Sequence, residues 1–114
     1  RTRLAAQRFV AAEQLHQAAD RQLVRAAGIV TCRQRPGTAS GIVFVTLEDE
    51  TGLANIVVHA WLVDRQRREL LGARLLGVFG QIQRAGEVVH LVAKRLVDLS
   101  SLLGQLSVHS RNFH

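Results

Sequence analysis

Residues 41–59 read GIVFVTLEDETGLANIVVH and contain two short β-rich runs joined by a tight turn. The first run alternates between two sets of side chains, which is the period expected of a strand with one buried face. One set is predicted to lie in the core, namely Val43, Val45 and Leu47, and the other consists of Ile42, Phe44 and Thr46. Glu50-Thr51-Gly52 supplies hairpin turn chemistry, so we expect the second run to return antiparallel to the first.

Three further runs outside this hairpin have strand character and are bounded by turn signals. They are LVRAAGIVTCRQR (23–35), LLGVFGQIQR (75–84) and EVVHLVAKRL (87–96). Pro36 and two glycines make residues 35–41 a loop, and Ala85-Gly86 turns the fourth run into the fifth.

Residues 61–72, WLVDRQRRELLG, predict a helix between the third and fourth runs. Its aliphatic side chains lie near one helical face and Gly72 stands where a C-cap belongs; they are Leu62, Val63, Leu70 and Leu71. Three strands, a helix and two strands is the order of the five-stranded OB barrel. The predicted fold class is therefore mainly β, an OB-fold barrel with a helix between strands three and four.

Glycines within the predicted strands indicate sharp coiling or bulges, as a small barrel requires. They are Gly28 in the first run and Gly77 and Gly80 in the fourth. The alternative is that small residues are merely tolerated at these positions.

The two ends of the chain differ from the barrel in pattern. Residues 4–19, LAAQRFVAAEQLHQAA, favour a helix of moderate amphipathicity that ends at Asp20. The expected organisation is an N-terminal helical lead-in at 1–22, a nucleic-acid-binding barrel at 23–97 and a tail at 98–114. A short helical turn is expected near 100–106.

Composition narrows the partner and the compartment. The chain has 114 residues, enough for one domain, and a formal charge of +6 that favours a polyanion such as nucleic acid or an anionic membrane surface. The single cysteine, Cys32, excludes an internal disulfide and suits a reducing cytosol. No apolar run approaches the roughly 20 residues that span a bilayer. We expect a cytoplasmic protein without membrane partners and, because it begins at Arg1 and contains no Met, a piece of a longer chain.

No pattern in the sequence predicts catalysis or a cofactor in this chain. The five histidines lack metal-ligand spacing, and neither a Walker lysine nor a nucleophile elbow is present. The acidic cluster Glu48-Asp49-Glu50 could hold Mg²⁺, but a solvated hairpin is the favoured interpretation.

Nucleic-acid binding is better supported, because the face of strands two and three in OB barrels receives single strands. Phe44 would lie there with Thr46 and could stack on a base, and the alternative is burial under a loop or the N-terminal helix. Arg33 and Arg35 flank the adjoining loop and could contact phosphates or simply be solvated. Further candidates are Asn55 for a base edge and Lys94 and Arg95 for a basic track. Trp61 is expected to close the bottom of the barrel.

Four segments resemble one family: RQRPGTASGIVFVTLEDETGLANIVV (33–58), RQRRELLGARLLGV (65–78), HLVAKRLVDLSSLLG (90–104) and SRNFH (110–114). They are similar to the C-terminal OB domain of bacterial error-prone, damage-inducible DNA polymerases of the replicative alpha-subunit-like class C family. The resemblance implies a non-catalytic module that binds single-stranded template DNA during damage tolerance and translesion synthesis. It also implies that the polymerase palm, whose carboxylates hold Mg²⁺, lies elsewhere in the polymerase chain, with other mutagenesis or replication proteins as further partners.

A weaker similarity links VFVTLEDETG to the anticodon-binding OB domains of class II aminoacyl-tRNA synthetases. There a Phe matching Phe44 stacks on an anticodon base, and Arg33 and Asn55 match an Arg and a Gln. The chain departs from the polymerase pattern at His59-Ala60, where that family reads Trp-Pro, which bears on how the helix begins. Two competing hypotheses are a protein-interaction module that docks polymerase accessory subunits and a free-standing tRNA-binding protein.

Overall fold

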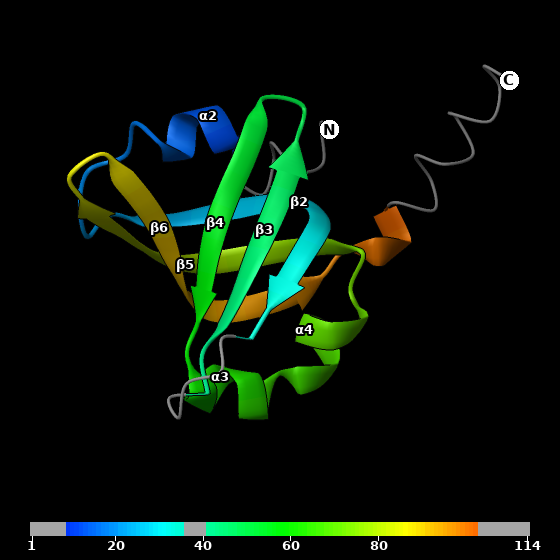
Figure 1. Ribbon diagram of the computed structural model, residues 1–114. Helices are drawn as coiled ribbons and strands as arrows, with labels where there is room; N and C mark the ends of the chain where they lie inside the picture. Colours follow the sequence, from blue (N-terminus) through cyan, green and yellow to red (C-terminus); the bar gives the residue numbers. More distant parts are fainter. Residues whose placement is uncertain (1–8, 36–40, 103–114) are drawn as a thin grey trace, which may run out of the picture.

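Five long strands form a closed barrel in the computed structural model, which describes residues 9–35 and 41–102 (Figure 1). The strands are β2 (Leu23–Gln34), β3 (Val43–Asp49), β4 (Gly52–Val58), β5 (Leu75–Ala85) and β6 (Val88–Asp98). They follow the order β2-β3-β4-β6-β5, and β5 pairs again with β2 to close the ring. The β4–β6 pairing is parallel and the other pairings within the ring are antiparallel. The predicted fold class is confirmed.

Aliphatic side chains from alternate positions of every barrel strand fill the interior. The predicted core positions of β3 are confirmed, since Val43, Val45 and Leu47 are all buried. Ile56 and Leu91, on neighbouring strands β4 and β6, are fully buried beside them. Each such aliphatic side chain contributes about 1.5–3 kcal/mol by leaving water, so this layer supplies much of the stability.

The N-terminal helix predicted before the barrel is present, but over the described residues it is shorter than the predicted range of 4–19. Residues Phe9–Val10 form a short strand, β1, parallel to β2, and only Ala12–Leu15 form a helix, α2. The helix ends at Leu15 rather than Asp20, and residues 4–8 lie outside the described residues. The helical propensity of alanine is a weak preference, and here the hydrogen-bonding edge of β2 and the burial of Leu15 in the core override it.

The helix predicted at 61–72 is interrupted and forms two short helices, α3 (Ala60–Arg65) and α4 (Arg67–Gly72). Gln66 lies at the break with a non-helical backbone (φ −124°, ψ 42°). Its side-chain amide donates to the carbonyl oxygen of Leu96 and accepts from the Leu96 N–H, both at 2.7 Å. This pair of hydrogen bonds ties the helices to β6.

Helices α3 and α4 lie at one end of the barrel and α2 at the other (Figure 1). Leu62, Val63 and Leu70 are buried and close that end. Trp61 does not: it is 52% exposed, so the prediction that it closes the barrel is wrong, and Leu71, expected on the buried face, is also exposed. His59-Ala60, which departs from the Trp-Pro pattern, lies at the helix start, with His59 as the N-cap of α3.

Two of the three strand glycines occupy positions of close backbone approach. A Cβ on Gly80 would lie 2.3 Å from the carbonyl oxygen of Val92, beside a shift of register in the β5–β6 pair. A Cβ on Gly28 would lie 2.8 Å from the carbonyl oxygen of Glu48. A bulge is present beside Gly80, but its extra residue is Lys94 on the partner strand β6, whereas Gly77 pairs in regular register.

Beyond β6 the chain turns back toward the start of β5. The Leu99 N–H donates to the carbonyl oxygen of Leu75, and the Ser100 hydroxyl accepts from the Arg74 N–H at 2.9 Å. Residues 100–102 are helical, which is the beginning of the turn predicted at 100–106, and the rest of the tail lies outside the described residues. None of the helices in the described part of the chain has the length and apolar character needed to cross a bilayer.

Candidate nucleic-acid interface

A continuous row of outward-facing side chains crosses the barrel at the level of Phe44. The register pairs Phe44 of β3 with residues on the strands to either side, and the row continues through the parallel β4–β6 pair to β5. We call this row the platform, and it consists of Gln34, Phe44, Val57, Val92 and Gln81. It has an aromatic ring and two valines between two amides.

Phe44 is 37% exposed, an unusual position for a phenyl ring in the middle of a sheet. The neighbouring Val57 is buried and provides an apolar floor beside the ring. Helix α2 packs against β4 and β2 and does not bury Phe44. The alternative that the N-terminal helix covers this ring therefore does not hold for the described part of the helix. An exposed ring on a pleated surface is the arrangement on which an unpaired base can stack.

Side chains that can form hydrogen bonds line the next row of the same face. Thr46 and Asn55 stand directly opposite each other across the β3–β4 pair, and Cys32 of β2 stands on the other side of Thr46. Gln83 and His90 are opposite each other on β5 and β6. Amides and hydroxyls can both donate and accept hydrogen bonds, so this row can meet base edges without fixing one base identity.

The structure places Arg33 away from the platform. A shift of register between Val30 and Cys32 pairs Arg33 with the inward-facing Val45, on the opposite side of the strand from Phe44. Its guanidinium donates from Nε to the carbonyl oxygen of Leu70 at 2.7 Å and from Nη2 to that of Ala73 at 2.5 Å. Arg33 therefore caps the end of α4, and its side chain does not share a surface with Phe44.

The other predicted cations divide between two surfaces. Arg35 is exposed just after β2, and Lys94 is exposed two residues beyond Val92 of the platform. Arg95 instead pairs with Phe79 of β5, over whose ring the guanidinium of Arg25 lies at 5.5 Å. Lys94 and Arg35 border the platform strands, whereas Arg95 belongs to the β2–β5–β6 side of the barrel.

The acidic hairpin is organised around Asp49 by hydrogen bonds. Its carboxylate accepts from the Ala12 N–H at 2.7 Å, from the hydroxyl and N–H of Thr51, both at 2.7 Å, and from the Gly52 N–H at 3.1 Å. Burial alone would raise the pKa of Asp49, but these hydrogen bonds outweigh it and hold the pKa below its usual value. Within residues 9–35 and 41–102 no group of three His, Cys, Asp or Glu side chains is placed to hold a metal.

A pocket of about 370 Å³ adjoins the platform and shares Gln81 and Val92 with it. Its other walls include Arg21, His59 and Gln83. None of these residues was predicted as a site residue from the sequence, although the alternation that buries Ile82 turns Gln81 and Gln83 outward.

The closed five-stranded barrel with helices after its third strand defines the class of this chain as an OB fold. Solved structures agree in fold. The asparaginyl-tRNA synthetase from Pyrococcus horikoshii matches 80% of this chain with 23% of its own, at a TM-score of 0.66 and 22% identity. The OBody AM1L10, solved bound to hen egg-white lysozyme, matches 81% of this chain with 93% of its own, at a TM-score of 0.64 and 14% identity.

The resemblance stated from the sequence is confirmed: over its whole length the chain is similar to the C-terminal portion of error-prone DNA polymerases. It is 70% identical over 114 residues to the error-prone DNA polymerase of Azoarcus sp. (strain BH72) and 68% identical over 111 residues to that of Dechloromonas aromatica (strain RCB). The chain spans 11% of the length of each of these relatives. No family model matches the chain.

Proposed function

We propose that this chain is the single-strand-binding module of an error-prone DNA polymerase and contacts template DNA through the platform. The observation that carries the proposal is the row from Gln34 to Gln81 with an exposed Phe44 at its centre. A formal charge of +6 adds a nonspecific attraction for the phosphate backbone. Similarity to the error-prone polymerases supports DNA as the polyanion.

Each part of the platform has a distinct role in this proposal. Phe44 stacks on one base, with the partly exposed Val92 against its neighbour and the buried Val57 as an apolar floor between them. Thr46 and Asn55 hydrogen-bond base edges, and Arg35 and Lys94 attract phosphates along the track. The chain itself catalyses nothing: the Mg²⁺-binding carboxylates of the parent polymerase lie elsewhere, and the module acts in the cytoplasm during translesion synthesis.

Replacement of the aromatic ring tests this role. The Phe44→Ala variant is expected to bind oligothymidylate with roughly tenfold lower affinity than the wild type, because stacking of one base on an aromatic ring contributes about 1–3 kcal/mol. Fluorescence anisotropy with a labelled oligonucleotide measures the loss.

Val97→Ala is the matched control, since Val97 is 40% exposed, close to the 37% of Phe44, but lies on the β5–β6 side of the barrel. Wild-type affinity in Phe44→Ala, or equal losses in both variants, would show that the platform is not the DNA surface. A structured RNA bound more tightly than the oligothymidylate would favour the tRNA-binding alternative.

The competing function, a protein-interaction module that docks accessory subunits, is favoured by one observation. Several exposed aliphatic side chains lie away from the platform, among them Ile29 and Leu71, which meet in a pocket of their own.

A further inference from the structure

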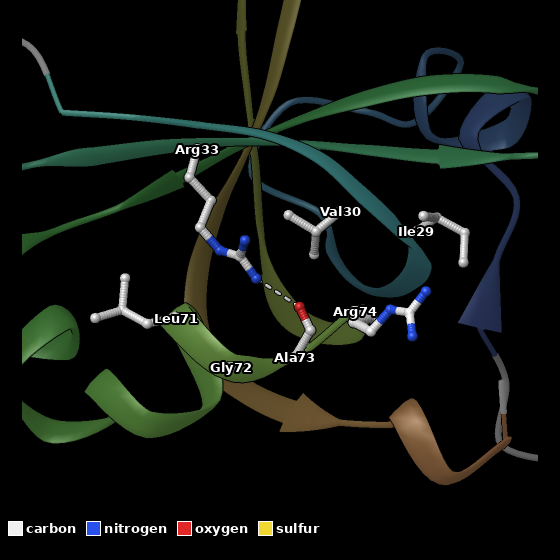
Figure 2. Close-up of a pocket in the computed structure, with 7 residues that line it drawn as sticks. All are labelled: Ile29, Val30, Arg33, Leu71, Gly72, Ala73 and Arg74. Atoms are coloured by element: carbon white, nitrogen blue, oxygen red, sulfur yellow. Dashed lines mark hydrogen bonds between the residues drawn. The ribbon is translucent and has the colours of Figure 1, made fainter. Parts of the chain in front are cut away.

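A pocket of about 400 Å³ lies between the middle of β2 and the end of α4 (Figure 2). Two walls form it. One consists of Ile29, Val30 and Arg33 on β2, and the other of residues 71–74, which are the end of α4 and its connection to β5. The side chain of Arg33 reaches from the strand toward Ala73. Arg33 faces away from the platform, so this pocket is separate from the proposed DNA surface.

The charged groups of the pocket are both guanidinium ions, from Arg33 and Arg74. No acidic residue lines it, and the described residues give neither arginine a carboxylate partner. Arg33 is instead held by two carbonyl oxygens, which orient it without neutralising its charge. A guanidinium has five N–H donors, so the two bonds leave donors for a further acceptor. The ligand best suited to such a pair is an anion with two oxygen acceptors.

The remaining lining is aliphatic rather than aromatic. Ile29 is 37% and Leu71 is 55% exposed, and Val30 adds a further aliphatic side chain to the β2 wall. Leucine- or isoleucine-like side chains pack well against such a surface, whereas a nucleobase gains most by stacking on an aromatic ring, and no aromatic residue lines this pocket. This lining favours a peptide over a nucleotide as the occupant.

The backbone of β2 beside the pocket also suits a peptide. β2 pairs with β5 as far as Ile29, and the Val30 N–H donates to the carbonyl oxygen of Arg74 at 2.9 Å. From residue 31 to residue 34 the described part of the chain pairs β2 with β3 alone. One edge of this segment therefore has no strand partner among the described residues, and such an edge can accept an extended peptide.

We propose that this pocket binds an acidic peptide segment of a partner protein, in which a carboxylate meets Arg74 and Arg33 and an adjacent aliphatic side chain packs on Ile29 and Leu71. This site is independent of the DNA surface. It gives the module a protein-docking face on the side of β2 away from the platform.

Titration of the isotope-labelled chain with a capped hexapeptide of alternating aspartate and leucine tests the proposal. The backbone amides of residues 29–33 and 71–74 should shift, and the same peptide with asparagine in place of aspartate should bind roughly tenfold more weakly, as expected for loss of charge-assisted hydrogen bonds. Arg74→Gln should lose about the same factor. Leu71→Asp, at an exposed position, should weaken binding further by repelling the peptide carboxylates.

Arg68→Gln is the charge-matched control, because Arg68 is exposed on α4 but does not line the pocket. The pocket is not a peptide site if millimolar peptide shifts none of these amides, if Arg68→Gln loses as much affinity as Arg74→Gln, or if oligothymidylate shifts these amides and the peptide does not. Phe44→Ala should leave peptide binding unchanged, so failure of this proposal and failure of the DNA-binding proposal give different results.

Discussion

A single inserted residue decides which surface Arg33 serves. Up to Ile29 the odd-numbered side chains of β2 face outward, as the exposed Arg25 and Ile29 show. The shift of register at Thr31 reverses this alternation, so Gln34 joins Phe44 and Arg33 turns toward α4. The position of such a bulge is set by pairing with β3, which is why the sequence of β2 alone placed Arg33 near the wrong groove.

Gly80 is the residue at which the barrel tolerates least change. A Cβ there would overlap the carbonyl group of Val92, which is backbone and cannot move aside as a flexible side chain would. Gly80→Ala is therefore expected to lower the free energy of unfolding by about 2–3 kcal/mol, as in overpacked cores. The urea-unfolding midpoint measures the change.

Gly72→Ala is the control for Gly80→Ala, because Gly72 ends α4 and a Cβ on it would meet nothing within 4 Å. Its stability should stay the same or rise by about 0.5 kcal/mol, since alanine restricts the unfolded chain. Equal stabilities of the two variants would mean that the β5–β6 backbones are not held as close as the structure has them.

At the scale of elements, the β3–β4 hairpin and α2 depend on one carboxylate. Asp49 closes the hairpin through Thr51 and Gly52 and also receives the N–H of Ala12, the first residue of α2. The turn could be predicted from Glu50-Thr51-Gly52, but its contact with α2 could not, because the partner is 37 residues away in sequence. The one-turn helix is therefore held by tertiary contacts rather than by its own propensity.

The lowered pKa of Asp49 makes this contact sensitive to acid. A carboxylate whose pKa is lower in the folded state stabilises the fold fully at pH values above its ordinary pKa of 3.8. This contribution is lost as the pH falls through the folded-state pKa. Asp49→Asn should be about 1 kcal/mol less stable than the wild type near neutral pH. The gap should shrink as the pH falls below 3.8 and through the lower folded-state pKa of Asp49.

Urea unfolding of both proteins across this range measures the gap. Asp64→Asn serves as the control, because Asp64 is 76% exposed and pairs only with the exposed Arg67 among the described residues. A gap between wild type and Asp49→Asn that stays constant with pH would contradict the assigned role of the carboxylate.

For the whole molecule, the barrel could be predicted because each strand has a local sequence pattern: apolar and polar side chains alternate along it and turn residues bound it. The predictions that were wrong or missing concern residues whose positions depend on segments far apart in the sequence. Trp61 was expected to close the barrel as the largest apolar side chain, but the smaller Leu62, Val63 and Leu70 already fill that end, and Trp61 stays outside. The platform amides Gln34 and Gln81 were missed because only the register across five strands brings them into one row with Phe44.

If the chain binds DNA as proposed, its net charge of +6 adds a nonspecific attraction, and the salt dependence of binding can tell which cations contact the bound strand. Each phosphate contact contributes about one unit to the slope of log affinity against log salt concentration. Lys94, two residues beyond Val92 of the platform, and Arg95, paired with Phe79, are adjacent in sequence but border different surfaces. Lys94→Gln should therefore reduce the slope for oligothymidylate by about one, and Arg95→Gln should leave it close to the wild-type value. Equal reductions would mean that the strand follows the net charge of the barrel rather than the platform, and a reduction in Arg95→Gln alone would move the DNA path to the side of Phe79.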